Sequence, residues 1–441
     1  MMSENKDAEA IRTEIFNLVD QYYELKHKGT PFVPGESHVP VSGKVFDSDD
    51  IKHVVDSALD AWFTTGRFNT QFEKELAKTI GVKKTLTVNS GSSANLLAVA
   101  ALSDESWGDK RIKPGDEFIT TPVSFPTTIN PLLLYGLTPI FVDVHIPTYN
   151  IDVDQIEQAI TPKTKAIVVA HTLGNPYQVD KIVAIAKKHN LWVIEDCCDA
   201  LGATYKNQHV GTYGDIGTLS FYPAHHITMG EGGAVFTNNS KMATILESFR
   251  DWGRDCWCEP GKDNTCGKRF DWCLGGLPKG YDHKYIYSRI GYNLKITDMQ
   301  AALGVSQLRK LSGFVAQRKK NFSRLKEGLK DLQNKIILPE ATVDSDPSWF
   351  GFLITLKEEA GISRVDLVKQ LTDKKVATRL LFAGDIRQQP YFKDIPHSNV
   401  GTLPNTEVVL NNTFWIGVTP MIDDQMVDYI VKSFHDIFNQ K

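Results

Sequence analysis

The chain has 441 residues, of which 41% are hydrophobic and 23% charged, and its formal net charge is -4. This composition is that of a globular protein long enough for one large core and a smaller domain, and a nearly neutral charge gives no electrostatic signature of nucleic-acid or anionic-membrane binding. The polar, acidic start (MMSENKDAEA) is unlike a signal peptide, and no apolar run approaches the roughly 18 residues of a membrane span. We therefore expect a cytoplasmic protein with no nucleic-acid and no membrane partner.

The first two thirds of the chain predict helices followed by alternating strands and helices. A helical arm over residues 10–29 and an extended Pro- and Gly-rich stretch lead to an amphipathic helix over residues 49–63. Strands that alternate with helices from about residue 80 to 240 predict a mostly parallel sheet covered on both faces. The strands are expected in EFITT, PIFVDV, KAIVVAHT, LWVIED, GTLSFY and AVFT.

Residues 251–290, called the insertion below, differ from this pattern. They are rich in Gly, Trp, Cys and charge and lack periodicity, which predicts a long functional loop. Past about residue 315, a charged helix, two or three strands and a terminal helix predict a smaller α+β domain. The expected organisation is an N-terminal arm (1–50), a large domain with the insertion (51–314) and a small C-terminal domain (315–441).

A Gly-Ser-Ser turn, Gly91 to Ser93, leads directly into an Ala- and Leu-rich helix. The free N–H groups of the first helical turn and the helix dipole attract phosphate, and the hydroxyls of Ser92 and Ser93 add donors. Taken alone, the pattern is more typical of an ordinary serine helix cap. It predicts a phosphate site only together with the next two features.

Two further residues fit a cofactor with a planar ring. Asp196 ends the apolar segment LWVIED, and the carboxyl ends of parallel strands are where α/β proteins place their sites. A carboxylate there can accept the hydrogen bond of a protonated pyridine nitrogen, whereas a helix-capping aspartate is an equally good explanation of Asp196 alone. Phe125, after the strand EFITT, is placed to stack on such a ring, although a lone aromatic more often belongs to the core.

In this order, and followed by SFYPAHHITMGEGG, these features resemble the fold-type I pyridoxal phosphate (PLP) enzymes of the nucleotide-sugar aminotransferase and dehydratase family. The resemblance covers nearly the whole chain, and the segments that carry it include TTGRFNTQFEKELA and GYNLKITDMQAALG. It implies an α/β fold of the PLP-dependent transferase type and a nucleotide-sugar substrate. It also implies that Ser220 binds the cofactor phosphate and that Asn293 reaches the phosphate of the neighbouring subunit, hence a homodimer with shared sites.

The family's aminotransferases carry a lysine, which binds PLP covalently, where this chain has His225. An imidazole forms no stable bond of that kind, so free pyridoxamine phosphate (PMP) is the expected cofactor. A neutral histidine accepts protons near physiological pH, and at this position it would remove one from C4′ of PMP while a 4-keto sugar loses its C3 hydroxyl. The histidine thus predicts dehydration instead of transamination. A cofactor-free relic of the family is the alternative, and His226 is the second candidate base.

The six cysteines are too sparse for a disulfide scaffold and are clustered. Cys256, Cys258 and Cys266 form a C-x-C-x₇-C pattern, and Cys198 precedes them in EDCCDA. Four thiolates suit either a [2Fe-2S] cluster or a structural zinc ion. The spacing is neither that of zinc ribbons nor that of plant-type ferredoxins, so the chemistry alone leaves both metals open.

Within the family, the exchange of lysine for histidine marks the sugar 3-dehydratases, which finish either by hydrolysis or with two electrons from an iron–sulfur centre. The cysteine pattern resembles the iron–sulfur branch, which implies a [2Fe-2S] cluster on Cys198, Cys256, Cys258 and Cys266. It further implies CDP-4-keto-6-deoxy-D-glucose as substrate, on the path to 3,6-dideoxyhexoses of surface polysaccharide, and an NADH-dependent flavin/iron–sulfur reductase as partner. Because Cys198 follows Asp196 by two residues, their Cα atoms lie at most about 7 Å apart, which would place the cluster beside the cofactor.

Four more residues belong to this prediction. Asp199, in EDCCDA, and Tyr222, three residues before His225, are candidate catalytic residues, although strand-end packing explains Tyr222 equally well. Cys197 is expected to pack inward and Cys273 to be a bystander, while either could replace a ligand. The alternatives are a GDP-4-keto-6-deoxy-sugar 3-dehydratase that releases ammonia and a non-catalytic family member with structural zinc.

Overall fold

The computed structural model describes residues 2–256, 258 and 261–439 and confirms the α/β fold. Its largest element is an eight-stranded sheet with the order β1-β11-β10-β7-β6-β2-β3-β16. Every neighbouring pair from β10 to β16 is parallel, and β11 is antiparallel to both of its neighbours. The strands are β1 (Lys84–Val88), β2 (Glu117–Thr120), β3 (Thr138–Phe141), β6 (Thr164–Ala170), β7 (Trp192–Asp196), β10 (Ile216–Ser220), β11 (Gly233–Thr237) and β16 (Ser398–Asn399).

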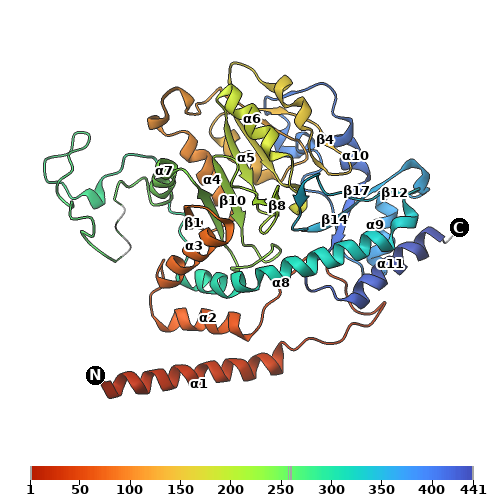
Figure 1. Ribbon diagram of the computed structural model, residues 1–441, viewed down its shortest axis with the longest axis horizontal. Coiled ribbons are helices and arrows are strands. Elements are labelled where there is room, and N and C mark those ends of the chain that lie inside the picture. Colours follow the sequence, from red (N-terminus) through yellow and green to blue (C-terminus); the bar gives the residue numbers. More distant parts are fainter. Residues whose placement is uncertain (1, 257, 259–260, 440–441) are drawn as a thin grey trace.

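Helices cover both faces of this sheet (Figure 1). Successive side chains of a strand point to opposite faces, so Val193 packs into one core and Ile194 into the other. Both faces are therefore buried, which explains why the strands read as continuous apolar runs. The helices on the Val193 side are α3 (Arg67–Ile80), α6 (Val179–His189) and α8 (Asp298–Gly328), and those on the Ile194 side are α4 (Gly91–Leu102), α5 (Pro126–Leu134) and α7 (Ser240–Arg250).

The C-terminal part forms a second, antiparallel sheet with the order β12-β14-β17-β15, packed against α9, α11 and the end of α8. This matches the expected smaller α+β unit. The division at residues 50 and 314 stays a prediction, because α8 runs through the second boundary and β16 joins the large sheet. The elements are β12 (Ile336–Ile337), β14 (Gly351–Leu356), α9 (Arg364–Asp373), β15 (Thr378–Arg379), α10 (Pro404–Asn412), β17 (Thr413–Gly417) and α11 (Asp424–Asn439).

The N-terminal arm is a long helix, α1 (Met2–Lys26), which lies along α2 (Ser48–Leu59) (Figure 1). Arg12 joins the two helices through Asp56 and Asp60, at 3.0 and 2.9 Å. The predicted second helix ends four residues earlier than expected because Ala61 has a positive φ of 53°, which an α-helix does not accommodate.

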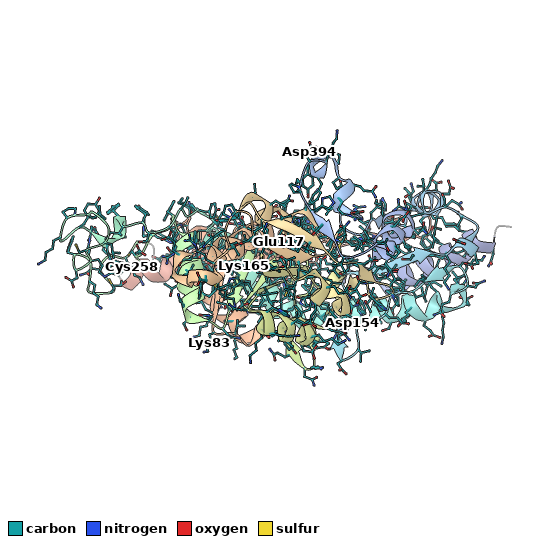
Figure 2. The ribbon with its side chains drawn as sticks, turned by 90° about the horizontal axis from the view of Figure 1, so that it is seen from above. Lys83, Glu117, Asp154, Lys165, Cys258 and Asp394 are labelled. Carbon is teal, nitrogen blue, oxygen red and sulfur yellow. The ribbon has the colours of Figure 1, made fainter. Side chains whose placement is uncertain are left out.

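The insertion is a loop, as predicted. Its described residues contain one helical turn, η4 (His283–Tyr285), and it projects from the body beyond α7 (Figure 1). Figure 2 shows Cys258 at this end of the molecule. No helix in the described part of the chain is long and apolar enough to cross a membrane. The remaining short strands are β4 (Val144–His145), β5 (Asn150–Ile151), β8 (Thr204–Tyr205), β9 (Gln208–His209) and β13 (Ser345–Asp346).

Candidate active site

A cavity of about 470 Å³ opens where three adjacent parallel strands end, and it is called the cofactor cavity below. Ala170, Asp196 and Ser220, the last residues of β6, β7 and β10, all line it. Aromatic side chains of the small unit, Phe350 and Trp415, close the opposite wall. The predicted site residues in its lining are Gly91, Ser92, Phe125, Asp196, Cys198, Asp199, Ser220, Tyr222 and His225.

Asp196 is buried and fixed by three hydrogen bonds. Its Oδ2 accepts from Asn95 Nδ2 at 2.9 Å and from Thr128 Oγ1 at 2.7 Å, and its Oδ1 accepts from the Cys198 N–H at 3.1 Å. Asn95 is itself oriented by Thr218, whose hydroxyl donates to Asn95 Oδ1 at 2.7 Å. A carboxylate held in this way is suited to bind a protonated ring nitrogen. Asn95 and Thr128 were missed in the sequence, although both lie within the motifs SSAN and FPTT.

Glu195, the residue before, points to the other face of the sheet. It accepts hydrogen bonds from the backbone N–H groups of Gly211 and Gly214, at 2.7 and 2.6 Å, and lies 3.1 Å from Nε2 of His171. Cys197 is buried on the same side, where burial and the charge of Glu195 raise the pKa of its thiol. Glu195 and Cys197 therefore support the loop after β9, and Asp196 alone of the two acids serves the cavity.

The start of α4 fits a phosphate. Ser90 caps the helix, with its Oγ accepting from the Ser93 N–H at 3.0 Å. A Cβ on Gly91 would lie 2.4 Å from Cβ of Ser220, so only glycine leaves room between the two segments. This gap leaves Ser92 and Ser220 in the lining beside the helix N-terminus. Ser93 does not line the cavity, because its hydroxyl contacts Ser90 Oγ at 3.0 Å.

Phe125 is the N-cap residue of α5 and stands at the mouth of the cavity, half exposed, with its ring edge-on to Phe382. This position suits stacking on a planar cofactor ring. Asn293 is exposed and outside the lining, and its Oδ1 accepts from Lys295 Nζ at 2.7 Å. Within one chain, Asn293 thus has no contact with the cavity in the described structure.

His225 and Asp199 face each other at the cavity wall. His225 Nδ1 lies 3.2 Å from Asp199 Oδ1, a distance that allows an ion pair although the atoms are not aligned as a hydrogen bond. The imidazole also contacts the Phe350 ring, with centroids 5.3 Å apart. Arg318 donates to the His225 carbonyl at 3.5 Å. Burial lowers the pKa of Arg318 to about 10, against the opposing charge of Asp199, so the guanidinium remains charged behind this pair.

The two neighbouring histidines differ in their surroundings. His226 is buried outside the cofactor cavity and makes a 2.8 Å hydrogen bond from Nε2 to the Ser348 carbonyl. Burial, followed by the charge of Arg318, holds the pKa of His226 well below its usual range. His225 is therefore the imidazole that meets the cavity. Tyr222 lines the cavity as well, with half of its side chain exposed.

The insertion brings three of the four predicted metal ligands together around a histidine. Nε2 of His283 lies 3.4 Å from Sγ of Cys256 and 3.6 Å from Sγ of Cys266. The Cys258 N–H donates to Cys256 Sγ at 3.4 Å. Partial burial opposes ionisation of the Cys258 thiol, but hydrogen bonds from Thr265 and Cys266 outweigh it and lower its pKa to about 6. Such a low pKa favours the thiolate that a metal requires.

The fourth predicted ligand is elsewhere. Ligand atoms of Cys256, Cys258 and His283 lie within 4.8 Å of one another, and in the described part of the chain Cys198 belongs to no such group. Cys198 lines the cofactor cavity, where burial and the charge of Asp196 raise the pKa of its thiol. Sequence reasoning missed His283, whose only signal was its place in the insertion. Cys273 is exposed, with Sγ 4.0 Å from the Leu277 carbonyl.

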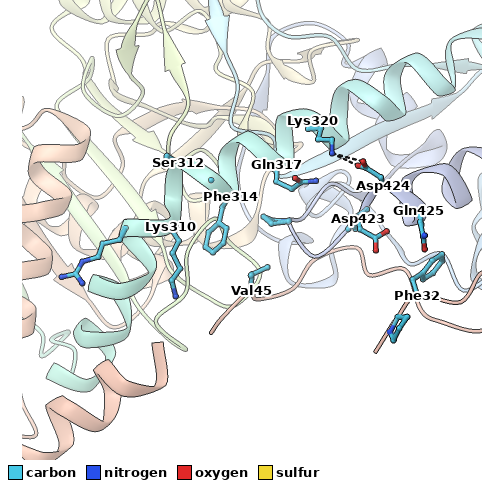
Figure 3. A pocket seen from close by; sticks show the side chains of 15 residues that line it. Phe32, Val45, Lys310, Ser312, Phe314, Gln317, Lys320, Asp423, Asp424 and Gln425 are labelled. Carbon is cyan, nitrogen blue, oxygen red and sulfur yellow. Dashed lines mark hydrogen bonds and ion pairs between the residues drawn. The ribbon is translucent and has the colours of Figure 1, made fainter. Parts of the chain in front are cut away.

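A larger hollow, of about 1030 Å³, lies between α8, residues 31–45 and the start of α11 (Figure 3). Two of its lysines are held in ion pairs. Lys320 Nζ lies 2.8 Å from Asp424, and Lys310 Nζ lies 2.8 Å from Asp50. None of the predicted site residues lines this hollow, so the candidate active site is the cofactor cavity.

Residues 45–435 match the DegT/DnrJ/EryC1/StrS aminotransferase family, and the chain belongs to this family. It is 58% identical to the lipopolysaccharide biosynthesis protein RfbH of Salmonella typhimurium, over 98% of this chain and 99% of that protein. It is 52% identical to the dTDP-4-dehydro-2,6-dideoxy-D-glucose 3-dehydratase of Saccharopolyspora spinosa, over 93% of this chain and 89% of that enzyme.

Among solved structures, the GDP-4-keto-6-deoxy-D-mannose-3-dehydratase of E. coli with bound hydrated PLP aligns with a TM-score of 0.80 and 30% identity, over 90% of this chain and 98% of that one. These comparisons confirm the predicted family and the PLP-dependent transferase fold. The chain is thus an enzyme of the sugar 3-dehydratase and aminotransferase family. The cofactor cavity fits a PLP-type cofactor without a covalent link, because none of the described lining residues is a lysine.

Proposed function

We propose that this protein is a PMP-dependent nucleotide-sugar 3-dehydratase. The observation that carries the proposal is the imidazole of His225, which stands beside Asp199 in a cavity whose described lining contains no lysine. A base that cannot bind the cofactor covalently is free to move protons throughout the reaction. Relatives named as 3-dehydratases at 52% and 33% identity support the same reaction type.

In this proposal, some residues of the cavity bind the cofactor and others transfer protons. Gly91, Ser92 and Ser220 would hold the phosphate at the start of α4, Phe125 would cover one ring face, and Asp196 would hold the proton of the ring nitrogen. When bound, PMP supplies a conjugated ring that acts as an electron sink. The proposed base for proton removal is His225, which lines the same cavity.

His225 would take a proton from C4′ while the C3 hydroxyl of a 4-keto sugar leaves. Asp199, 3.2 Å away, would stabilise the imidazolium that forms and keep its orientation. Tyr222, half exposed in the same lining, would hold a second transferable proton on the side of the leaving hydroxyl. Arg379 in the lining offers a guanidinium to the diphosphate of the nucleotide.

The proposed substrate is CDP-4-keto-6-deoxy-D-glucose, for the synthesis of 3,6-dideoxyhexoses of a surface polysaccharide. The cysteine pattern supports this choice, together with a relative named for lipopolysaccharide biosynthesis. The protein would act as a homodimer in which Asn293 reaches the partner's phosphate site. Exposure of Asn293 outside its own cavity supports that arrangement.

The proposed second cofactor is a [2Fe-2S] cluster that would deliver two electrons, one at a time, from an NADH-dependent flavin/iron–sulfur reductase. Cys256, Cys258 and Cys266 would supply three thiolates, and their convergence around His283 supports a metal at the insertion. Cys198 is the fourth ligand that the resemblance implies. Reduction would add two electrons and two protons to the dehydrated sugar and leave a methylene group at C3.

Two other functions have support of their own. The likeness to GDP-4-keto-6-deoxy-D-mannose-3-dehydratase favours an enzyme that ends by hydrolysis and ammonia release. The grouping of Cys256, Cys258 and His283 is also compatible with structural zinc. Iron and labile-sulfide analysis with a visible spectrum separates the three. We expect about two irons and two sulfides per chain, whereas zinc or the absence of metal would favour the alternatives.

A direct test of the cofactor proposal uses borohydride. The purified enzyme should release PMP on gel filtration, and borohydride should attach no cofactor to the chain. Recovery of a phosphopyridoxyl-lysine peptide would refute the proposal. His225→Lys should create such a peptide and bring in weak transaminase activity, which provides the positive control.

A further inference from the structure

The proposed ligands of the metal lie in two separate places within one chain. Cys198 stands at the phosphate end of the cofactor cavity, since a Cβ on Gly91 would lie 3.1 Å from its Sγ. The other three, Cys256, Cys258 and Cys266, lie around His283 on the insertion, which projects past α7 (Figure 1). A cluster needs four ligands that converge on it, and the described residues of a single chain do not bring these four together.

Helix α5 connects the two places. Its start belongs to the cavity, where Phe125, Thr127 and Thr128 are part of the lining. Its end belongs to the base of the insertion, where the hydroxyl of Tyr135 lies 3.0 Å from that of Tyr292. A helix of nine residues is about 13 Å long. The cavity mouth and the base of the insertion are therefore neighbours, separated by one short helix.

Several large apolar side chains are exposed at the two ends of this helix and on the insertion. Phe125 is 52% exposed at the cavity, Leu134 is 79% exposed at the end of α5, and Ile290 is 93% exposed at the base of the insertion. Leu134 and Ile290 line one hollow together, so these two exposed side chains are neighbours, with Asp104, Glu105 and Arg289 in the same lining. Tyr285 and Tyr287, on the insertion itself, are each at least half exposed as well. Large apolar side chains that are exposed close to one another are typical of a protein interface.

A second copy of the chain is the occupant that accounts for both observations. In a two-fold dimer, a contact between one surface patch and another occurs twice, with the roles exchanged. An axis that crosses the surface along α5 would place the insertion of each copy over the cofactor cavity of the other. Asn293, which pairs with Asp251 at the neck of the insertion and is exposed, would move to the partner's cavity by the same operation.

We propose that the metal site is completed in trans: Cys198 of one chain joins Cys256, Cys258 and Cys266 of the other, so that the dimer holds two sites, each built from both chains. This inference rests on the proposed function and specifies how its cluster is assembled. His283, with Nε2 near two of the sulfurs, would hydrogen-bond to the thiolates and hold the insertion cysteines together. Each site would then lie beside Gly91 and Ser220, next to the cofactor it serves.

Mixed dimers test this assignment. A Cys198→Ser chain and a Cys256→Ser chain, each with its own affinity tag, are co-expressed, and heterodimers are isolated on two successive columns. Neither homodimer should hold a cluster. The heterodimer should hold one, because Cys198 of the Cys256→Ser chain meets the intact insertion of the Cys198→Ser chain. Iron, labile sulfide and visible absorbance should therefore return to half of the wild-type value per dimer.

The matched control is a heterodimer of the Cys198→Ser chain with a Cys273→Ser chain. It should hold one cluster per dimer whether the ligands come from one chain or two, and thus verifies that tags and substitutions leave assembly intact. A cluster-free Cys198→Ser/Cys256→Ser heterodimer beside a loaded control would overturn the assembly in trans. So would a Cys198→Ser homodimer that keeps its iron while His283→Ala loses it, because His283 would then be the fourth ligand. Wild-type dimers without iron and sulfide would instead remove the cluster from the proposed function itself.

Discussion

The cofactor cavity and the insertion are both dense in functional side chains, but they are built in opposite ways. In the cavity, Asp196 comes from the end of a buried strand and is fixed by Asn95 and Thr128. In the insertion, Cys256 and Cys266 come from a loop whose described part has one helical turn. A site on strand ends is organised by the core, whereas a site on a long loop depends on what it binds. We therefore expect the cavity to keep its chemistry when the proposed metal site is destroyed.

The largest effect is expected from Cys256→Ser, which should stop the reaction step assigned to the insertion and leave the step assigned to the cavity unchanged. Cys256→Ser should abolish formation of the 3-deoxy product, even with reductase and NADH, because in the proposed reaction the electrons reach the sugar through the cluster. The same variant should still exchange the C4′ proton of PMP with solvent when given the 4-keto sugar, and take up ¹⁸O from water at C3. Proton NMR and mass spectrometry measure these two exchanges. If the variant lost exchange too, the metal site would be structural for the cavity, and the contrast between the regions would fail.

His225→Asn should have the opposite effect: it should slow proton exchange in the cavity and leave the insertion unchanged. Because general base catalysis contributes roughly 10²–10⁴-fold, the C4′ exchange rate should fall by about that factor. The metal should be unaffected, with a full visible spectrum that the reductase can still bleach. Asp199→Asn should cause a smaller loss, since it removes only the charge 3.2 Å from His225 Nδ1. Normal exchange in His225→Asn would move the base to Tyr222.

The contrast between core-organised and loop-built regions also explains which parts of the fold could be predicted from the sequence. Each of the six predicted segments contains a strand of the large sheet. These strands could be found because a strand that is buried on both faces consists of a contiguous run of apolar residues. β1 (Lys84–Val88) was missed, since its threonines break such a run. β16 (Ser398–Asn399) consists of two exposed polar residues, and only its pairing with β3 makes it a strand. The local sequence pattern therefore predicts strands that are buried in the core. It does not predict strands that form only because of a tertiary contact.

The same division holds for the candidate site. Residues that follow a strand or begin a helix, such as Asp196 and Gly91, are visible in the sequence because the topology fixes their place. Arg318, which lies 93 positions from His225 and contacts its carbonyl, has no local signal. His283 was equally hidden, although its cysteine neighbours were found. The separation of Cys198 from the insertion cysteines within one chain could not be predicted from spacing, since spacing in the sequence does not fix how far apart two segments lie in the fold.

A more moderate effect is expected from Thr128→Val, which removes one of the hydrogen bonds to Asp196 and keeps the side-chain shape. Hydrogen bonds to charged groups contribute about 1.5–3 kcal/mol, so PMP should bind roughly 10- to 100-fold more weakly. Equilibrium titration of the cofactor-free protein with PMP measures this. Iron content should stay at the wild-type value, and a loss of iron with unchanged PMP affinity would contradict the independence of the two regions.

The smallest effect concerns His226, which is buried beside the cavity and keeps the turn in place through the Ser348 carbonyl. Its pKa is held well below its usual range by burial and Arg318, so the folded protein binds fewer protons there than the unfolded chain. Stability from this group is present above the unfolded pKa of about 6.5 and is lost as the pH falls below it, by up to about 1.4 kcal/mol per pH unit. Denaturant titrations at pH 7.5 and 5.5 should show this loss, and His226→Gln, which keeps a donor for the carbonyl, should flatten the dependence. An equally steep dependence in His226→Gln would assign the acid sensitivity to another group.

A substitution in the insertion serves as the control for this measurement. Cys273 is exposed, so Cys273→Ser should leave both the free energy of unfolding and its pH dependence unchanged.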